Sequence, residues 1–351
     1  MQPDPEFWKG RRVGVTGGTG FLGWQIVSQL HQRGAEVRVL ALEPQAAHPI
    51  HQLKPLTTIW GDVRDPSAAG RALDGCSFVF HTAGVVGVWG AAMERMWSVH
   101  VDGTAAVLAA APRDARIVHT SSLTTIGASR TDQVLNEDAG PHFQKCNLGY
   151  VKAKRAAEQL ALQAAADGRY VAITNPGYLV GPEDHERSIM GRFCVRFWKG
   201  RVPMAPPGGL NLVDVRDAAI GHLLAAERGQ SGRRYILGGE NHRFPSLLNQ
   251  MAQVADCRPR IRLRAPWLLM AGFAALAELR SKFSGKEPYP SLGHARLNRW
   301  HWFGDSSRAA TELGYHFRPL IASLRDSYDW HHRRDPIRPR GLPRWLLRPA
   351  A

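Results

Sequence analysis

The sequence is poor in cysteine, and its four cysteines stand far apart. Cys76, Cys146, Cys194 and Cys257 form no CxxC pair and show no metal-ligand spacing. Small secreted scaffolds and structural zinc sites depend on closely spaced cysteines. We therefore expect neither a disulfide framework nor a bound metal, and we expect a reducing, cytoplasmic compartment.

An export signal and a long apolar run are also lacking. Residues 1–10 carry Asp4 and Glu6 among prolines, whereas a secretory signal places basic residues before an apolar segment. The most apolar stretch, residues 266–279, is shorter than the roughly 20 residues that cross a bilayer. We expect no export and no transmembrane helix.

Acidic residues are scarce relative to basic ones. The chain has 45 Lys and Arg against 30 Asp and Glu, a net charge of +15, which favours an anionic partner. Residues 331–351 form a Pro-rich, basic tail that we expect to be flexible, with six arginines against Asp335. Together with residues 266–279 this tail suits a peripheral membrane contact, although a merely solvated tail remains the simpler interpretation. We expect no nucleic-acid partner.

Strand-like and helical segments alternate through the first half of the chain. Apolar runs predict strands at residues 12–16, 36–42, 57–60, 78–82, 116–120 and 170–174. Helical patterns separate them at residues 21–33, 66–73, 91–111 and 148–166. This alternation predicts an α/β fold with a doubly wound parallel sheet, the Rossmann arrangement.

The alternation breaks up after Asn175, and prolines and glycines follow at residues 203–209. We therefore expect an NAD(P)-binding Rossmann domain at residues 1–175, to which residues 212–230 return. A smaller substrate-binding lobe is expected at 176–330, followed by the tail at 331–351.

A glycine-rich turn joins the first strand to the first helix. Gly17, Gly20 and Gly23 lie in it, and Gly18, Gly20 and Gly23 also fit the GxGxxG spacing. Glycines permit the tight turn, let backbone N–H groups approach a pyrophosphate and let helix and strand touch. The turn therefore predicts a bound dinucleotide.

Two acidic residues bear on the rest of that cofactor. Glu43 follows the second strand, within reach of a ribose and with no arginine placed there, so NAD is weakly favoured over NADP. Asp62 follows the third strand and could accept a hydrogen bond from adenine. It could equally be a strand-end turn residue.

Tyr150 and Lys154 lie four residues apart on a predicted helix and so share one face. An ammonium beside a phenol stabilises the phenolate, which lets the tyrosine exchange a proton with a substrate hydroxyl. Ser121 and Ser122 end the strand at 116–120 and can donate a hydrogen bond to a substrate oxygen. The YxxxK spacing alone is common on solvated helices. Its combination with the glycine-rich turn and with Ser121 and Ser122 is what favours a catalytic role.

In these motifs the sequence resembles the extended short-chain dehydrogenase/reductase superfamily, over residues 12–330. The likeness rests on TGGTGFLG at 16–23, GDV at 61–63, VFHTA at 79–83, TSS at 120–122, YVKAK at 150–154 and GP at 181–182. Its pattern is similar to dihydroflavonol 4-reductase-like proteins and hopanoid-associated sugar epimerases, with features of 3β-hydroxysteroid dehydrogenases at residues 87–90. The resemblance implies an enzyme in which Ser122, Tyr150 and Lys154 are catalytic.

The resemblance also implies which residues bind cofactor and substrate. Besides Glu43, the implied cofactor set is Gly17, Thr19, Gly20, Phe21, Leu22, Gly23, Asp62, Val63, Thr82, Ala83, Gly84, Tyr150, Lys154 and Pro176. The implied substrate contacts are Val86, Trp89, Ser122 and Tyr178. A homodimer is the oligomeric state that we consider.

The sequence departs from the family pattern at three positions. His100 stands where an asparagine is usual, Asn175 replaces a common arginine, and Tyr178 replaces an asparagine that binds ligand in sugar-nucleotide epimerases. Tyr178 disfavours a nucleotide-sugar substrate. The first hypothesis is hydride transfer between nicotinamide and a secondary alcohol or ketone of a largely apolar molecule. Aromatic and apolar residues expected near the cleft agree, unless they belong to the core: Trp89, Met93, Trp97, Phe193, Phe197 and Trp198. The alternative is a nucleotide-sugar epimerase or dehydratase that retains its NAD.

Overall fold

The computed structural model describes residues 2–87, 90–139, 148–185, 188–202, 204–256, 266–285 and 288–337, with the side chains of 90–93 left out. Trp89, Cys146, Cys257, the Met93 side chain and the tail beyond Ile337 therefore lie outside the described residues. The two other cysteines, Cys76 and Cys194, are buried free thiols.

Seven strands form one parallel sheet in the order β3-β2-β1-β4-β5-β6-β9. They are β1 (Arg12–Thr16), β2 (Glu36–Ala41), β3 (Thr57–Trp60), β4 (Phe78–His81), β5 (Arg116–Thr120), β6 (Val171–Pro176) and β9 (Arg234–Leu237). Because all strands run the same way, their carboxyl ends share one edge. The order reverses between β1 and β4, and ligands of doubly wound sheets bind at such a switch point.

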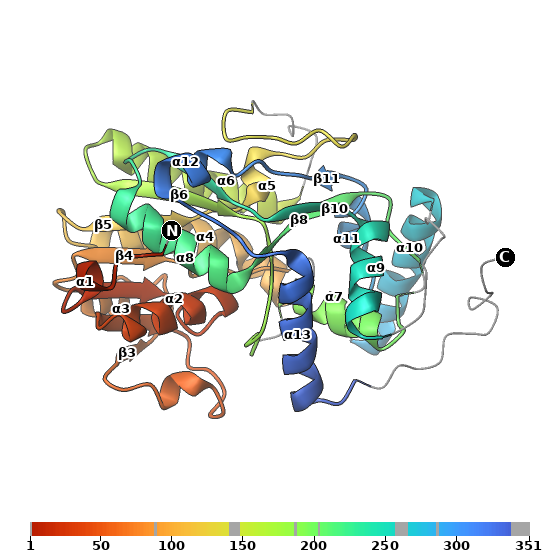
Figure 1. The fold of residues 1–351 in the computed structure, drawn as a ribbon, viewed down its shortest axis with the longest axis horizontal. Helices are drawn as coiled ribbons and strands as arrows, with labels where there is room; N and C mark the ends of the chain where they lie inside the picture. The colour runs from red at the N-terminus through yellow and green to blue at the C-terminus, as the bar shows by residue number, and fades with distance from the viewer. Residues whose placement is uncertain are drawn as a thin grey trace.

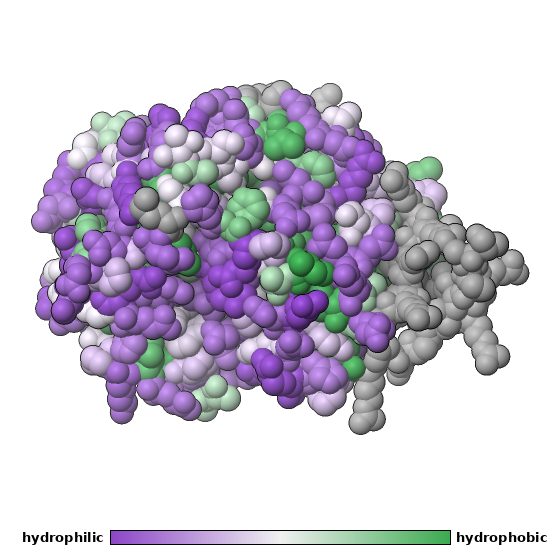
Figure 2. All heavy atoms as spheres, in the orientation of Figure 1, coloured by the Kyte–Doolittle hydropathy of each residue, from purple (hydrophilic) through white to green (hydrophobic). Residues whose placement is uncertain are grey.

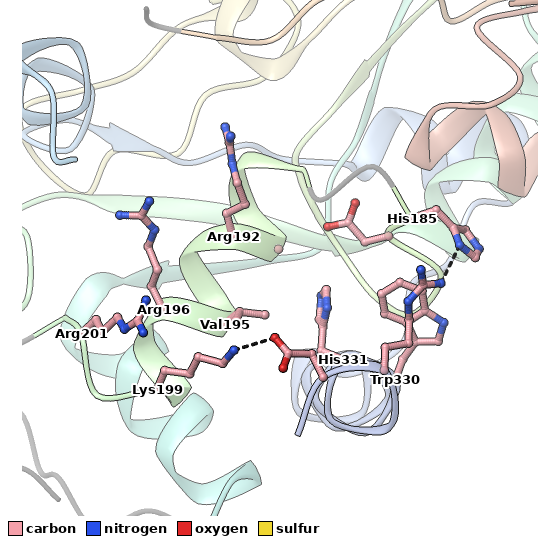
Figure 3. Close-up of a pocket in the computed structure, with 12 residues that line it drawn as sticks. His185, Arg192, Val195, Arg196, Lys199, Arg201, Trp330 and His331 are labelled. Atoms are coloured by element: carbon pink, nitrogen blue, oxygen red, sulfur yellow. Dashed lines mark hydrogen bonds and ion pairs between the residues drawn. The ribbon is translucent and has the colours of Figure 1, made fainter. Parts of the chain in front are cut away.

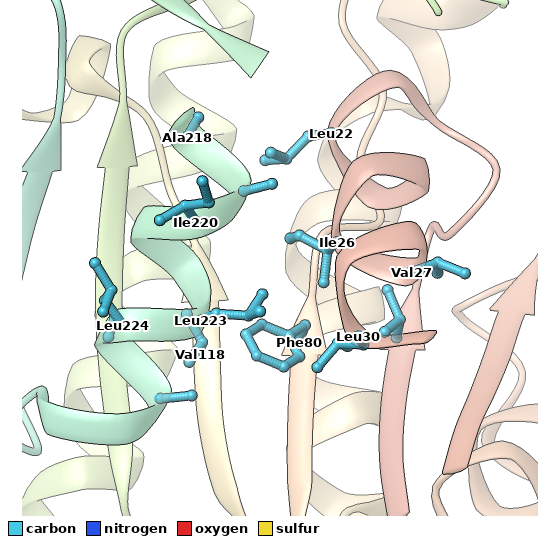
Figure 4. Packing of buried hydrophobic residues seen from close by; sticks show 14 of the residues in the cluster. Leu22, Ile26, Val27, Leu30, Phe80, Val118, Ala218, Ile220, Leu223 and Leu224 are labelled. Atoms are coloured by element: carbon cyan, nitrogen blue, oxygen red, sulfur yellow. The ribbon is translucent and has the colours of Figure 1, made fainter. Parts of the chain in front are cut away.

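Helices cover both faces of this sheet (Figure 1). One face carries α1 (Pro5–Trp8), α2 (Phe21–Gln32), α8 (Val215–Arg228) and α12 (Ser307–Leu313); the other carries α3 (Pro66–Leu73), α4 (Gly90–Ala110) and α6 (Gly149–Ala166). In Figure 4, Ile26 and Leu30 of α2 point toward Leu223 of α8 across Phe80 of β4. Burial on both faces explains why these strands are nearly continuous apolar runs.

A second, smaller sheet lies beyond the carboxyl edge, and most of the remaining helices lie on its side of the molecule (Figure 1). Its strands are β7 (Tyr178–Val180), β8 (Gly209–Asp214), β10 (Glu240–Arg243) and β11 (His301–Trp302), with β8 paired to the other three. The remaining helices are α5 (Leu123–Ile126), α7 (Ile189–Trp198), α9 (Phe244–Val254), α10 (Trp267–Ser284), α11 (Leu292–Leu297) and α13 (Leu320–Arg334), besides a 3-10 turn, η1, at Pro49–His51. Helix α5 instead contacts β6 and α6.

The predicted Rossmann fold is confirmed, and each predicted strand and helix of the first half has its counterpart within two residues. Residues 234–237, in the range expected for the second lobe, instead form the edge strand β9 of the large sheet. The lobe boundaries themselves stay a prediction. No helix in the described part of the chain is long and apolar enough to cross a membrane.

Candidate active site

The glycine turn lies at the carboxyl end of β1 and has no room for side chains. Gly17 has a φ of 73°, and a Cβ there would lie 2.7 Å from the backbone N and Cα of Ala83. A Cβ on Gly23 would overlap the carbonyl oxygen of Gly17. Helix α2 begins after Gly20, which offers no capping side chain, so the first N–H groups of α2 are available to an anion. This cradle fits a pyrophosphate.

The segment after β4 closes the other side of the turn. Thr82 donates its hydroxyl to the Thr16 carbonyl at 2.7 Å, and the Ala83 N–H reaches the Thr16 Oγ1 at 3.3 Å. Gly84 packs so closely on His100 that a Cβ would lie 2.6 Å from its Cε1. The predicted residues of both segments therefore come together at the switch point.

The remaining predicted cofactor residues flank this cradle along the chain. Leu22 is buried in α2, Phe21 packs against the same core, and Thr19 is hydrogen-bonded through its backbone to His48. Pro176 ends β6. Their contacts with a cofactor stay predictions.

The two acidic candidates differ in their surroundings. Glu43 is exposed just after β2. The Asp62 carboxylate accepts 2.7 Å and 3.0 Å hydrogen bonds from the Arg64 guanidinium and one from the Arg64 backbone N–H at 2.9 Å. This pairing lowers the pKa of Asp62. Asp62 thus forms the strand-end turn, and an additional adenine contact stays a prediction, as does that of the neighbouring, buried Val63.

The structure brings Ser122 and Tyr150 together. Ser122 ends the β5 segment and caps α5, where its Oγ accepts hydrogen bonds from the Thr124 N–H at 3.2 Å and the Thr124 hydroxyl at 2.9 Å. A hydroxyl has two acceptor positions and one proton. Both acceptor positions are therefore used, and the Ser122 proton is left to donate to the Tyr150 hydroxyl, with which it is hydrogen-bonded, or to a substrate oxygen.

Lys154 lies one turn further along α6 and is buried. Its Nζ donates to the Thr120 carbonyl at 2.8 Å. Burial lowers the pKa of Lys154 to about 8, against the opposing effect of Glu158. Burial also raises the pKa of Tyr150, and the Ser122 hydrogen bond opposes that rise. In the protein alone the net effect on the phenol is therefore a raised pKa, because burial outweighs the effects that oppose it.

His100, which the sequence marks only as a departure from the family pattern, lies against Tyr150. Its ring meets that of Tyr150 edge-on, with centroids 5.8 Å apart, and its Nε2 lies 2.9 Å from the Val85 carbonyl. Burial lowers the pKa of His100 to about 3. A neutral imidazole thus forms one wall beside the phenol.

A buried carboxylate, which sequence patterns did not indicate, holds the serine segment in place. The Glu158 Oε2 accepts hydrogen bonds from the hydroxyls of Ser121 and Thr125 and from the Asn175 Nδ2, the last at 2.9 Å. Asn175 also donates to the Ser122 carbonyl at 3.2 Å. These contacts join α6, β6 and the serine segment, so Asn175 helps to hold the serine segment in place.

The expected apolar cleft lining is only partly supported. Phe197 and Trp198 are buried in the core, and the Trp198 Nε1 donates to the Met251 carbonyl at 3.0 Å. For these two residues the alternative interpretation, that they belong to the core, is the one that the structure shows. Phe193 and Tyr178 pack at the margin of that core. Val86 and Trp97 are exposed, and Trp89 falls outside the described residues.

A separate cavity of about 230 Å³ lies between α7 and α13 (Figure 3). Its lining is basic and was not predicted: Arg192, Arg196, Lys199, Arg201 and Arg334, with His185, His331 and Trp330. Asp335 pairs with Lys199 at 2.7 Å, and Arg334 contacts His185 at 3.0 Å. The lining contains none of the catalytic or cofactor residues named above.

The sequence is similar to those of known proteins. A family model described as the NAD dependent epimerase/dehydratase family matches residues 13–238. A Synechocystis protein named "Putative dihydroflavonol 4-reductase" is 32% identical, covering 90% of this chain and 93% of its own length. Sterol demethylase protein B of Methylococcus capsulatus is 31% identical, covering 92% of this chain and 99% of its own.

Solved structures share the fold. The crystal structure of gox2253 superposes with a TM-score of 0.79 at 28% identity, covering 93% of this chain and 99% of that one. The dTDP-glucose 4,6-dehydratase DesIV of Streptomyces venezuelae, solved with NAD and DAU, gives 0.69 at 22% identity, covering 93% and 97%. The glycine cradle, the Ser122–Tyr150–Lys154 arrangement and the family match lead to one assignment. The chain belongs to the NAD-dependent epimerase/dehydratase family of extended short-chain dehydrogenases/reductases and is an NAD(P)-dependent oxidoreductase.

Proposed function

We propose that this enzyme transfers a hydride between nicotinamide and a secondary alcohol or ketone of a largely apolar substrate, with Tyr150 as the acid/base. The observation that carries the proposal is the hydrogen bond between Ser122 and Tyr150, with Lys154 buried one turn away. The nicotinamide, when bound, supplies or accepts the hydride. The protein's task is to hold the substrate oxygen and to move one proton.

The two hydroxyls divide that task. The Ser122 proton is free to donate because Thr124 occupies its acceptor positions. In ketone reduction Ser122 donates a hydrogen bond to the carbonyl oxygen while Tyr150 transfers its proton to that oxygen; alcohol oxidation reverses the transfer. The raised pKa of Tyr150 in the protein alone suits the proton-donating direction, because the phenol stays protonated at neutral pH.

The substrate class is supported by the relatives that align over most of the chain. The names of the two relatives described above refer to a dihydroflavonol and a sterol. A third relative, the 3-beta-hydroxysteroid dehydrogenase of Mycolicibacterium neoaurum, is 32% identical and covers 89% of this chain. The nucleotide-sugar enzymes among the solved structures are 22% identical or less, which supports the fold alone. Tyr178, which stands where sugar-nucleotide epimerases carry a ligand-binding asparagine, also favours an apolar substrate over a nucleotide sugar.

The test is turnover of NADH or NADPH with a panel of sterol, flavonoid and long-chain ketones. Tyr150→Phe should lower kcat by about a hundredfold or more while the cofactor still binds. Tyr170→Phe is the matched control, because that hydroxyl donates to the Gly229 carbonyl away from the site; its kcat should stay unchanged. Equal activity of wild type and Tyr150→Phe would overturn the assignment of Tyr150.

The second candidate is a nucleotide-sugar epimerase or dehydratase, favoured by the family match and by the shared fold. Such an enzyme reoxidises its own cofactor and retains it. Absorbance and mass spectrometry of the protein as isolated separate the two. Tightly held NAD, with no ketone turnover and tight binding of a sugar nucleotide, would replace the first proposal by the second.

We also propose that NAD is preferred over NADP, since Glu43 is exposed beside the end of β2. A carboxylate there binds a ribose 2′-hydroxyl and repels a 2′-phosphate. Titration should give a lower Kd for NADH than for NADPH, and Glu43→Gln should narrow the difference. A lower Kd for NADPH in the wild type would contradict the preference. A homodimer, which light scattering would detect, stays a proposal.

A further inference from the structure

Helix α10 exposes its apolar residues. Leu268, Leu269, Phe273, Leu276, Leu279 and Phe283 are between 44% and 86% exposed. By contrast, the face of the molecule seen in Figure 2 is mostly hydrophilic with small, separate apolar patches. Six large apolar side chains on one helix are an unusual surface for a soluble protein.

Their spacing places them on a single outward face. Leu268, Leu276, Leu279 and Phe283 follow one another at helical intervals of eight, three and four residues, and Leu269 and Phe273 border them. The opposite face is attached to the protein: Ala274 and Ser281 are buried, and the Glu278 carboxylate accepts the Leu292 N–H of α11 at 2.8 Å. Figure 1 shows α10 at the end of the molecule away from the seven-stranded sheet.

The charges along this part of the chain are mostly positive. Arg280 and Lys282 are exposed on α10 and flank the apolar stripe. Along the chain, Arg258, Arg260, Arg262 and Arg264 precede the helix and Lys286 follows it. From 256 to 287 seven cations stand against three acids, Asp256, Glu278 and Glu287, and Glu278 bonds inward to α11. An apolar helix face bordered by cations matches the interface of an anionic bilayer.

A second copy of the chain fits this face less well. Packing two such helices together would bring two sets of these cations into one interface, and like charges brought together oppose association. The composition of α10 also limits the mode of contact, because no helix in the described part of the chain is long and apolar enough to cross a membrane. The helix would lie in the interface plane.

We propose that α10 docks the enzyme on the surface of a bilayer that contains anionic lipid: the apolar stripe enters the boundary between headgroups and acyl chains, and the flanking arginines and lysines bind the headgroups. Neither signal alone gives stable attachment, whereas the two together do. The basic tail adds Arg338, Arg340, Arg344 and Arg348 to the electrostatic part. The proposal does not depend on which alcohol or ketone the enzyme accepts.

The test is co-sedimentation of the full chain with phosphatidylcholine vesicles, with and without phosphatidylserine. The wild type should bind the mixed vesicles, and high salt should weaken binding. Leu276→Glu with Phe283→Glu should reduce binding roughly tenfold or more. The matched control is Val134→Glu with Phe317→Glu, which changes two exposed apolar side chains elsewhere and should bind as the wild type does.

Further variants separate the two signals. Arg280→Glu with Lys282→Glu should abolish the preference for phosphatidylserine, and deletion of residues 338–351 should weaken binding but leave cofactor binding intact. The α10 variants should keep wild-type turnover of a water-soluble ketone, which shows that they fold. Unchanged vesicle binding by the α10 double variant overturns the proposal. The proposal is also overturned if the wild type does not bind vesicles and light scattering shows that it is a dimer which the α10 double variant converts to a monomer.

Discussion

The ammonium of Lys154 is stabilised less well in the folded protein than in the unfolded chain. Burial lowers its pKa from 10.5 to about 8. Between pH 8 and 10.5 the unfolded chain holds a proton that the folded state has released, so folding stability rises with pH across this window. At neutral pH the folded protein therefore carries a cost of up to about 3 kcal/mol for the buried charge.

Lys154→Met should accordingly raise the free energy of unfolding at pH 7 by about 1–2 kcal/mol, once the lost hydrogen bond to the Thr120 carbonyl is counted. The gain should shrink as the pH rises and vanish only above pH 10.5, where the wild-type lysine is neutral in both states, while activity is lost at both pH values. Urea unfolding at the two pH values measures this. Lys152→Met, on an exposed position of the same helix, should show no such pH dependence. A Lys154→Met variant that is less stable than wild type at pH 7 would refute the argument.

At the residue scale, the sequence could predict groups that are linked by local spacing. Tyr150 and Lys154 are one helical turn apart, and Ser122 follows a recognisable strand. The roles of Glu158 and His100 depend on contacts with residues that lie far away in the sequence. Glu158 is hydrogen-bonded to Asn175 and Ser121, and the His100 ring contacts that of Tyr150. Helical periodicity marks Glu158 only as a charge on α6, and nothing in the pattern shows that it is buried.

At the scale of elements, the junction of β1 and α2 depends on the missing side chain of Gly23. A Cβ there would overlap the Gly17 carbonyl and lie 2.8 Å from the Thr82 Oγ1. Gly23→Ala must therefore move α2 away from β1, and NADH binding by fluorescence titration should weaken by about tenfold or more. Gly70→Ala in α3 is the control: a Cβ there meets nothing within 4 Å, so it should keep the affinity and add about 0.5–1 kcal/mol of stability. Equal NADH affinity in the two variants would show that the turn tolerates a side chain.

The two sheets were not equally predictable. The inner strands of the large sheet are buried on both faces and read as apolar runs, such as Phe78–His81, whereas the edge strand β3 is partly exposed. The small sheet contains β10, whose residues are Glu240–Arg243, and β11, which has two residues. Their pairing with β8 is a long-range contact, so neither periodicity nor composition marks them. β9 likewise pairs with β6 across a long separation in sequence, so the break in alternation does not mark it as a strand of the large sheet.

At the scale of the whole molecule, a row of buried histidines makes the fold sensitive to acid. Burial lowers the pKa of His81 and His100 to about 3 and of His222 to about 4, and that of His119 well below its usual value. All four are neutral when folded but acquire a proton near pH 6.5 when unfolded. The unfolded state thus binds more protons below pH 6.5, and stability falls as the pH drops through that value.

Each of these histidines should reduce the free energy of unfolding by about 1–2 kcal/mol between pH 6.5 and 5, so together they can remove much of the stability of a typical domain. Thermal unfolding should show a steep fall of Tm over this range. His119→Leu should lessen the fall of Tm between pH 7.5 and 5, because it removes one of the groups that take up a proton on unfolding. The substitution costs no hydrogen bond at Nε2, which has no partner in the folded protein. His316→Gln, at an exposed position, should leave the fall of Tm unchanged. A Tm that is level from pH 7.5 to 5 in the wild type would mean that these imidazoles accept protons without unfolding the chain.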